Sequence, residues 1–256
     1  MSIELHMDGP VAVVTINNTA KKNAVSFDMR KALEARFREL ADDDAVRAVV
    51  LTGAGDAFCS GADVEAMGGR DLPAARSSML HLHAMIRAVH GIDKPVIAAV
   101  RGAAAGVGLS LALACDFVLA GESARFAPVF KRIGLAPDGG AVWFLARQIG
   151  FSQAKEMLYN ARILDAREAL TLGLAQQMVP DADLLGEALR QAHDYAAGPS
   201  FALALTKQMF AGCVSPNLAQ FLELELLMQP QLTQTRDHAE GTAAFREKRK
   251  PAFIGR

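Results

Sequence analysis

The chain has 256 residues, of which 51% are hydrophobic and 21% are charged, and its formal net charge at pH 7 is -1. This composition is typical of a globular protein that can bury one sizeable core, and it excludes a largely disordered chain. The chain also lacks the excess of basic residues that favours binding to nucleic acid or to an anionic membrane, so we expect neither partner.

The three cysteines and the first residues indicate where the protein works. Cys59, Cys115 and Cys213 are widely spaced and form no CxxC pair, which is typical of reduced thiols in an intracellular protein. The N-terminus lacks the basic and apolar segments of a secretory signal. The longest apolar stretch, 103–114, is too short to cross a bilayer. We therefore expect a cytoplasmic protein.

The first half of the chain alternates predicted strands and helices. The β-branched run 11–16 predicts a strand, and Ser26 or Asp28 can cap a helix that continues to Ala41 with Met29, Leu33, Phe37 and Leu40 on its buried face. Further predicted elements are the strand 46–51, the helix 78–89, the strand 95–100, the helix 107–115 and the strand 117–120. This alternation predicts an α/β fold.

The second half is predicted to be helical, apart from a short apolar run at Met178 and Val179. The expected helices cover 139–149, 152–159, 166–172, 182–197, 200–211 and 217–228. Gly198-Pro199 interrupts the pattern, so we expect a core over 1–196 and a C-terminal helical region over 197–256. Within that region, 221–228 is too apolar for a free helix and should pack on the core or on a neighbouring subunit.

Four segments resemble the crotonase (enoyl-CoA hydratase/isomerase) superfamily in their order and spacing. They are AFCSGADV at 57–64, KPVIAAVRGAAAGVGL at 94–109, IGLAPDGG at 133–140 and EGTAAFREKR at 240–249. The resemblance implies an α/β core built as a spiral of ββα turns. It also implies that the C-terminal helices assemble the chain into a homotrimer or a dimer of trimers.

In that superfamily two backbone N–H groups form an oxyanion hole for the thioester carbonyl, and the resemblance assigns them to Ala62 and Val107. Elementary chemistry agrees, because a strand–turn–helix junction leaves unsatisfied N–H groups at the helix N-terminus, where the dipole favours negative charge. Tight packing of a Gly/Ala-rich junction without any ligand is the alternative explanation. Many relatives carry glycine at position 107, and valine restricts the local geometry.

The resemblance places the two glutamates of the hydratases at Ser110 and Phe130. Serine cannot serve as a carboxylate base, and phenylalanine cannot activate water. A hydratase mechanism is therefore not supported by these residues.

Asp138 is the carboxylate in a suggestive position. The Pro137-Asp138-Gly139 pattern resembles the branch of the superfamily that contains the ring-1,2-epoxyphenylacetyl-CoA isomerases and related enoyl-CoA isomerases. In that branch the matching aspartate moves a proton on the acyl chain, and one carboxylate suffices because the base that takes a proton can return it elsewhere. The alternative is that Asp138 only caps the following helix.

His83 is the second candidate, because on a helix it shares a face with Met79 and Ile86. The resemblance to 4-chlorobenzoyl-CoA dehalogenases matches His83 and Asp138 to the catalytic pair of that branch, with Phe130 replacing a tryptophan. A hydrogen-bonded core histidine is the alternative. His81, His90, Asp63 and Asp116 are expected to be structural or at the surface.

No dinucleotide-binding or P-loop motif and no metal-ligand spacing is found, so we expect no metal and no permanently bound cofactor. By resemblance, coenzyme A carries the substrate, and its adenine end lies near Lys22, Ala24, Ala57 and Asp63. Phe130 and the 67–73 region would shape the acyl pocket. Phe245 and Lys248 would close over the phosphates from a C-terminal helix of the same or a neighbouring subunit, unless this end of the helix is simply solvated.

The sequence thus predicts an acyl-CoA enzyme that stabilises an enolate, with double-bond isomerisation as the expected reaction. Two other chemistries stay open: enoyl-CoA hydration, and a dehalogenase-like hydrolysis through Asp138 and His83. A protein that binds CoA thioesters without turning them over is the non-enzymatic alternative.

Overall fold

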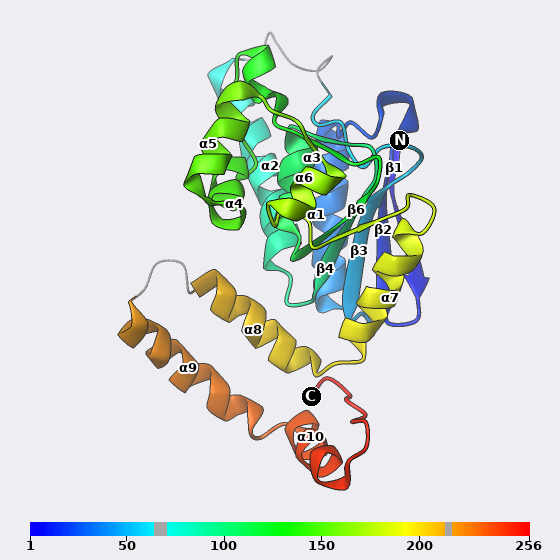
Figure 1. Ribbon diagram of the computed structural model, residues 1–256, viewed down its shortest axis with the longest axis vertical. Coiled ribbons are helices and arrows are strands. Elements are labelled where there is room, and N and C mark those ends of the chain that lie inside the picture. Colours follow the sequence, from blue (N-terminus) through cyan, green and yellow to red (C-terminus); the bar gives the residue numbers. More distant parts are fainter. Residues whose placement is uncertain (64–70, 213–216) are drawn as a thin grey trace.

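The structure is a computed structural model that describes residues 1–63, 71–212 and 217–256. Its larger sheet has the strand order β1-β2-β3-β4-β6-β9, in which β1 is antiparallel to β2 and the other strands are parallel (Figure 1). The strands are β1 (Ser2–Asp8), β2 (Val11–Asn17), β3 (Ala48–Gly53), β4 (Val96–Val100), β6 (Phe117–Gly121) and β9 (Gln177–Val179). β1 was not predicted, although Ile3, Leu5 and Met7 alternate with polar residues along it; most of its side chains are exposed at the sheet edge.

A second, three-stranded sheet joins β5 (Ala103–Ala105), β7 (Arg125–Ala127) and β8 (Leu164–Asp165). The prediction that no strand lies between 139 and the run at Met178 was wrong, because β8 pairs antiparallel with β7. Two or three residues give no periodicity, so such strands are recognised only from their partners. This small sheet holds the chain that leads from β5 into α3.

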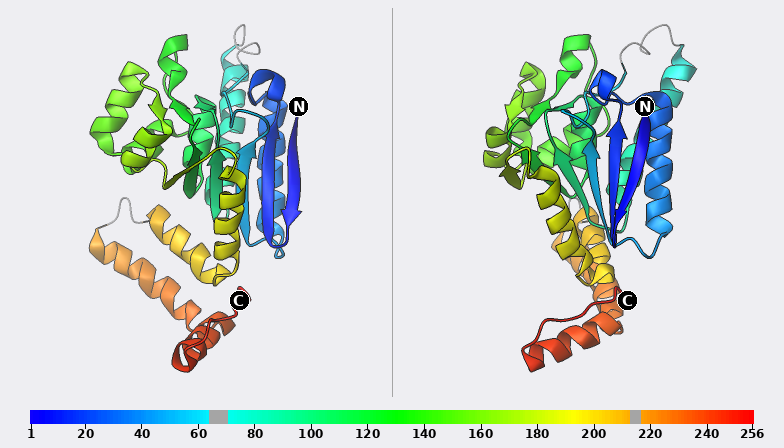
Figure 2. Two further views of the ribbon diagram at one scale, coloured as in Figure 1. Left: turned by 45° about the vertical axis from the view of Figure 1, so that its right-hand side comes forward. Right: turned by 90° about the vertical axis from the view of Figure 1, so that its right-hand side faces the viewer.

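Helices cover both faces of the larger sheet, and each face has its own apolar core (Figure 2). α1 (Phe27–Asp42), α2 (Leu72–Gly91) and α3 (Val107–Ala114) pack on one face, and α7 (Leu184–Ala196) packs on the other. In β2 the side chains alternate between the two cores: Ala12 and Val14 face the first, and Val11 and Val13 face the second. Strands buried on both faces explain the continuous apolar runs in the sequence.

The structure shows where α1 and α2 begin. Ser26, not Asp28, caps α1 by accepting a hydrogen bond from Met29 N. α2 begins at Leu72 rather than at 78, capped by Asp71. Pro73 lies in the first turn of α2, where proline is tolerated.

Shorter helices and a C-terminal arm complete the fold. They are η1 (Thr19–Lys21), η3 (Val129–Ile133), α4 (Ala141–Gln148), α5 (Gly150–Asn160), α6 (Ala166–Thr171), α8 (Ser200–Gly212), α9 (Leu218–Leu232) and α10 (Arg236–Glu247). The arm, α8 to α10, extends from the lower end of the core in Figure 1. Arg47 ties it to the core through Ser200 and Gly198, and Lys207 does so through Asp116. The change from α7 to α8 falls where the sequence interrupts its pattern at Gly198-Pro199.

Gly108 lies in the first turn of α3, where the helix approaches the chain at Cys59. A Cβ atom at position 108 would lie 2.1 Å from the main-chain oxygen of Cys59. We expect Gly108→Ala to lower the free energy of unfolding by up to about 2 kcal/mol, because overpacking costs about 1–3 kcal/mol and the gain in helix propensity offsets only roughly 1 kcal/mol of it. Denaturant unfolding measures this change.

The matched control is Gly186→Ala in α7, where nothing lies within 4 Å of the added Cβ. This variant should be slightly more stable than the wild type, since alanine favours helix and meets no neighbour. If both substitutions changed stability by the same amount and in the same direction, the close approach at Gly108 would be refuted.

Candidate active site

The first oxyanion-hole candidate, Ala62, lies on the segment that follows β3. Cys59 pairs with β5, donating to Ala103 O and accepting from Ala105 N, both at 2.9 Å. Ala62 then forms a parallel bridge with Val25. The main chain of Val25 is hydrogen-bonded to the two neighbours of Ala62: its N–H donates to Gly61 O, and its carbonyl accepts from Asp63 N. The N–H of Ala62 therefore points away from Val25. No acceptor within the described ranges bonds to it.

The second candidate, Val107, is the first residue of α3. The N–H of Gly106 donates to Ala127 O at 3.0 Å, and the first N–H to bond within the helix is that of Ser110, which donates to Gly106 O at 3.1 Å. The N–H of Val107 has no acceptor in the part of the chain that the structure describes. Every residue of α3 is buried, so this positive helix end is withdrawn from bulk water.

The two junctions lie against each other. Gly61 has φ +114°, and a Cβ atom built on it would lie 2.9 Å from Ala105 O and 3.8 Å from Val107 N. Gly106 also has a positive φ, +52°. Each donor thus follows a glycine whose backbone conformation L side chains rarely adopt. The arrangement can bind a carbonyl oxygen that gains negative charge.

The positions of the two hydratase glutamates are filled by groups that cannot replace them. Ser110 is fully buried, and its hydroxyl donates to the main-chain oxygen of Asp138 at 2.8 Å. Phe130, on η3, is 4% exposed, and its ring edge would lie 4.0 Å from a Cβ at Gly106. Ser110 therefore fixes the backbone of Asp138, while Phe130 forms an apolar side of the site next to Gly106 and the N–H of Val107.

Asp138 does not cap a helix, so that alternative was wrong. α4 begins after Gly140 and has no side-chain cap. The Oδ1 atom of Asp138 is buried and has no hydrogen-bond partner among the described residues. An unpaired buried carboxylate oxygen costs free energy, and such a cost is typical of a group kept for chemistry.

Burial raises the pKa of the Asp138 carboxyl above its ordinary value, while the positive charge of Arg30, followed by that of His83, opposes this rise. Arg30 lies on α1 and is 9% exposed. The motifs did not point to Arg30, although an arginine beside Met29 on the apolar face of a predicted helix was a usable signal. The site therefore includes a cation that the motifs did not indicate.

His83 is half-buried on the inward face of α2, as predicted, and acts electrostatically on Asp138. Ile86, one turn further along α2, would lie 3.8 Å from a Cβ at Gly139, which places this part of α2 beside the Asp138 loop. His90 instead contacts Ala114 O, Trp143 and Phe144, and His81 contacts Phe27. These two histidines have the structural role that was expected.

The four residues predicted near the adenine end of coenzyme A lie on two loops that are hydrogen-bonded together. Lys22 O accepts from Ser60 N at 2.9 Å, and Asn23 Nδ2 donates to Ala57 O at 2.6 Å. Ala24 and Ala57 are buried, while Lys22 is exposed. Asp63 forms an ion pair with Lys21 at 2.8 Å. The structure thus brings Lys22, Ala24, Ala57 and Asp63 together.

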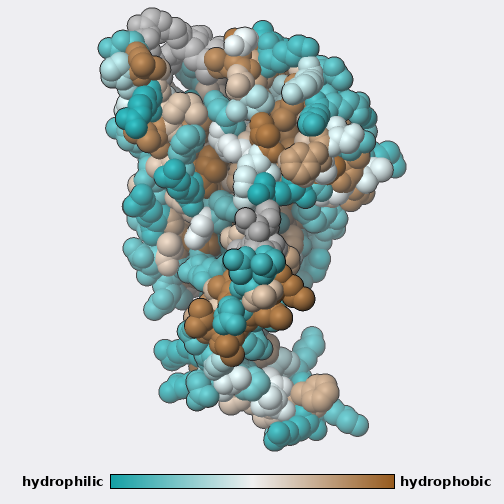
Figure 3. Space-filling view, turned by 90° about the vertical axis from the view of Figure 1, so that its left-hand side faces the viewer, coloured by the Kyte–Doolittle hydropathy of each residue, from teal (hydrophilic) through white to brown (hydrophobic). Residues whose placement is uncertain are grey.

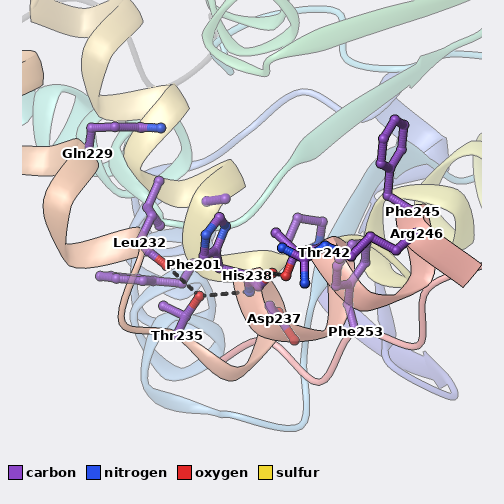
Figure 4. Close-up of a pocket in the computed structure, with 13 residues that line it drawn as sticks. Phe201, Gln229, Leu232, Thr235, Asp237, His238, Thr242, Phe245, Arg246 and Phe253 are labelled. Carbon is purple, nitrogen blue, oxygen red and sulfur yellow. Dashed lines mark hydrogen bonds between the residues drawn. The ribbon is translucent and has the colours of Figure 1, made fainter.

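Phe245 and Lys248 lie far from these loops within one chain. α10 is at the lower end of the molecule in Figures 1 and 2, whereas η1 is at the upper end. Phe245 is 86% exposed, and it lines a pocket of about 580 Å³ between the helices of the arm (Figure 4). The residues that line this pocket include neither Asp138 nor an oxyanion donor, so the pocket is not the candidate reaction site.

The remaining predictions concern residues or groups outside this arrangement. The predicted acyl-pocket segment 67–73 lies outside the described residues up to position 70. Asp116 is structural, as expected, because it accepts from Val96 N and pairs with Lys207. Over the described ranges, no three His, Cys, Asp or Glu residues are grouped to hold a metal ion, and no helix could cross a membrane.

Known proteins share both the sequence and the fold. The sequence model of the enoyl-CoA hydratase/isomerase family matches residues 6–256. The chain is 39% identical over 255 residues to a probable enoyl-CoA hydratase of Rhodobacter capsulatus, covering 100% of this chain and 98% of that protein. It is 33% identical to the 1,2-epoxyphenylacetyl-CoA isomerase of Escherichia coli, covering 98% and 97%.

Solved structures agree with the sequence relatives. An enoyl-CoA hydratase from Polaromonas sp. has a TM-score of 0.94 at 35% identity and covers 99% of this chain and 100% of its own. The crotonase-type α/β fold expected from the motifs is thereby confirmed. The chain belongs to the enoyl-CoA hydratase/isomerase family.

Proposed function

We propose that this protein is an enoyl-CoA isomerase that shifts a carbon–carbon double bond along the acyl chain of a coenzyme A thioester. The observation that carries the proposal is the buried Oδ1 of Asp138, which has no hydrogen-bond partner among the described residues. Its main chain is fixed by Ser110 at the buried end of α3, the helix whose first N–H would bind the thioester oxygen. A carboxylate held beside the helix that supplies one oxyanion donor can act together with that donor to form and stabilise an enolate.

The proposed reaction needs no second acid or base. Asp138 takes the proton from C2 of a 3-enoyl thioester, and the C–H electron pair forms the enolate whose oxygen accepts from Ala62 and Val107. Asp138, now protonated, returns the proton to C4. The electrons of the former C3=C4 bond form the new C–H bond, and the enolate electrons form the C2=C3 bond as the carbonyl is restored.

Hydration would require a group that activates water over C3. In the two positions that carry the hydratase glutamates, Ser110 is occupied with a main-chain oxygen and Phe130 is apolar. The relatives described above include both a hydratase and an isomerase, so their names support the family but not one reaction over the other. The substrate test below therefore includes a 2-enoyl-CoA, to which a hydratase would add water.

A second candidate is dehalogenase-like hydrolysis, favoured by the electrostatic proximity of His83 to Asp138. Asp138 would attack the ring carbon of a 4-halobenzoyl thioester and displace halide. Water activated by His83 would then hydrolyse the aryl ester on the enzyme. Phe130 weakens this candidate, because it lacks the indole N–H of the tryptophan in that branch.

The test offers the purified protein a trans-3-enoyl-CoA, a 2-enoyl-CoA and 4-chlorobenzoyl-CoA separately, with products identified by chromatography and mass. Isomerisation predicts conversion of the 3-enoyl ester to the 2-enoyl ester without a change of mass. In D₂O, part of the C2 hydrogen should reappear at C4, since one base carries it. Addition of water to the 2-enoyl ester, or release of chloride, would refute the proposal. Binding of all three without turnover would favour the non-catalytic alternative.

The substrate's carrier is proposed to be coenzyme A, held at its adenine end by the paired loops that contain Lys22, Ala24, Ala57 and Asp63. We propose no permanently bound cofactor and no metal. Within one chain, α10, which carries Phe245 and leads into Lys248, lies at the opposite end of the molecule from these loops, so the two residues do not close the same chain's site. Their contribution to binding the phosphates would have to come from a neighbouring subunit.

The C-terminal arm supports assembly into a homotrimer or a dimer of trimers, which is part of the proposal. In the described structure no residue of α9 is buried, although the helix is rich in leucine. Figure 3 shows apolar side chains gathered on the arm. The exposed ones on α9 are Leu218, Leu222, Leu226 and Leu227. A patch of this kind is typical of a subunit interface.

We expect the double variant Leu222→Glu/Leu226→Glu to dissociate the assembly, because each leucine contributes about 1.5–3 kcal/mol when buried and each glutamate would bring an unpaired charge into the interface. Light scattering after size exclusion measures the mass. The control is Gln220→Glu, which adds one negative charge on α9 outside the leucine patch and keeps the capping box with Asn217. A wild-type chain that is monomeric, or a double variant that keeps the wild-type mass, would rule out this interface.

A further inference from the structure

Ser110 is the one polar side chain on α3, whose other residues are apolar, and it is fully buried. Burying a hydroxyl costs free energy unless the hydroxyl forms a hydrogen bond. The Oγ atom of Ser110 lies 2.8 Å from Asp138 O and 3.4 Å from Gly106 O. A hydroxyl has one proton to donate. The shorter contact, with the main chain of Asp138, is therefore the hydrogen bond that this side chain makes.

The main chain of Ser110 bonds to the peptide that carries the second oxyanion donor. The N–H of Ser110 donates to Gly106 O at 3.1 Å. Gly106 O and the N–H of Val107 belong to one planar peptide unit, so a bond that fixes the oxygen also fixes the direction of the N–H. Ser110 thus joins the two halves of the site, through its main chain to the donor and through its side chain to Asp138.

Asp138 begins a tight turn that leads into α4. Asp138 O accepts a second hydrogen bond, from Ala141 N at 3.1 Å, and Gly139 and Gly140 between them have φ +59° and +83°. Positive φ at both central residues is the pattern of a type I′ turn, which glycine favours. Because Oδ1 of Asp138 has no hydrogen-bond partner among the described residues, the main chain of this turn decides where the carboxyl points.

The turn lies directly against Ser110. A Cβ atom built on Gly139 would lie 2.8 Å from Ser110 Cβ and 3.1 Å from Ser110 Oγ. A longer side chain at position 110, such as the glutamate that the hydratases carry there, would have to displace the turn. The small serine and the glycine turn therefore depend on each other.

We propose that Ser110 is a positioning residue for the reaction: it holds the turn that carries Asp138 at a fixed place relative to the Gly106–Val107 peptide, so that the carboxylate meets C2 of a thioester whose oxygen is bound by the N–H of Val107. This inference rests on the proposed function, in which Asp138 is the base. Proton transfer requires hydrogen-bond reach, and a misplacement of about 1 Å can cost roughly 100-fold in rate. Ser110 acts through the main chain of Asp138 and takes no part in the proton transfer itself.

The test is Ser110→Ala, which removes the hydroxyl and keeps the Cβ atom against which the turn packs. Asp138 O keeps its bond from Ala141 N, so the variant should fold. We expect kcat on a 3-enoyl-CoA to fall roughly 10- to 100-fold, while calorimetric binding of an unreactive thioester stays at the wild-type value. An unchanged kcat, or a loss that appears in binding alone, would indicate a merely structural role and overturn the inference.

The matched control is Thr52→Val, which also removes a hydroxyl that donates to a main-chain oxygen of another element. Thr52 Oγ1 donates to Ala99 O at 3.0 Å, a bond that joins β3 to β4 within the larger sheet. This variant should keep the wild-type kcat even if thermal unfolding shows a small loss of stability. An equal fall of kcat in both variants would mean that the loss of any such hydroxyl has this effect, and it would overturn the inference.

Hydrogen exchange at C2 separates this inference from the proposed function, because it requires the base and the oxyanion donors but no double bond. In D₂O, Asp138 would take a proton from C2 of butanoyl-CoA, exchange it with solvent and return a deuteron to the enolate, which mass spectrometry detects. Ser110→Ala should slow this exchange as it slows isomerisation. If the wild type exchanges C2 but isomerises no 3-enoyl thioester, the proposed function fails, and slower exchange in Ser110→Ala still supports the role of Ser110. A wild type that exchanges no C2 hydrogen of butanoyl-CoA or phenylacetyl-CoA overturns both.

The amide hydrogens of the turn provide a readout that requires no substrate. Without the Ser110 hydroxyl the turn should open more often, so the N–H of Ala141, which donates to the same oxygen, should exchange roughly two- to tenfold faster, as the loss of one hydrogen bond predicts. Hydrogen–deuterium exchange of the segment 138–146, followed by mass spectrometry, measures this rate, and Thr52→Val should match the wild type. An unchanged rate in Ser110→Ala would show that Ser110 does not hold the turn, and it would overturn the inference even in an active isomerase.

Discussion

Replacing Asp138 by asparagine is expected to abolish isomerisation while leaving the acyl-CoA bound. The substitution keeps the size of the side chain and removes only its ability to take and return a proton. General base catalysis is typically worth about 10²–10⁴-fold, so kcat should fall by at least about 100-fold. Steady-state kinetics on a 3-enoyl-CoA, together with calorimetric binding of an unreactive thioester, measures both quantities.

The control for this substitution is Asp44→Asn, an aspartate exposed outside the site, which should retain wild-type turnover. In the wild type, turnover should rise with pH, since the base must be ionised and burial raises the pKa of Asp138 above its ordinary value. The acid limb should therefore lie above that of an unperturbed aspartate, about 3.9. Full activity in Asp138→Asn would show that Asp138 is not the base.

Replacing Val107 by proline is expected to remove one of the two oxyanion donors with little change to the helix. Proline has no N–H and is tolerated at the first position of a helix. Loss of one such donor typically costs about 2.7–4 kcal/mol of transition-state stabilisation, or roughly 10²–10³ in kcat. The effect should appear in any reaction that passes through an enolate, so it does not depend on whether the chain isomerises or hydrates.

Val107→Ala serves as the comparison, because it shortens the same side chain and keeps the N–H. It should lose far less activity than Val107→Pro, and circular dichroism should show both variants folded. If the two variants lost activity equally, the side chain of Val107 and not its N–H would be the important group. The presence of valine at position 107, where many relatives carry glycine, would then be explained by the packing of its side chain.

The sequence indicated the chemistry because its signals are local. The Gly61-Ala62 and Gly106-Val107 steps, and the absence of glutamate at Ser110 and Phe130, are visible without a structure. The structure places both steps side by side and shows that Ser110 bonds to the backbone of Asp138. It also removes one alternative that the sequence left open, since the side chain of Asp138 caps no helix.

By itself, the sequence determined the alternation of strands and helices, the buried face of α1 and the break between α7 and α8 at Gly198-Pro199. Each follows from periodicity or from a breaker within a few residues. The short sheet of β5, β7 and β8 was decided only by pairing across the chain, whereas β1 carries an alternation of apolar and polar residues that the prediction overlooked. A strand of two or three residues has no pattern of its own, because its hydrogen bonds lie with distant residues.

The charges of the site were also decided by tertiary structure. A motif places Asp138 on a loop, but the buried state of its Oδ1 and the field of Arg30 depend on α1, α2 and α3 packing around that loop. Arg30 and Asp138 are far apart in sequence, so the charge of Arg30 can act on the carboxyl of Asp138 only through the fold. Local patterns specify which groups a chain carries, whereas the fold sets the distances and the exclusion of water that give those groups their chemistry.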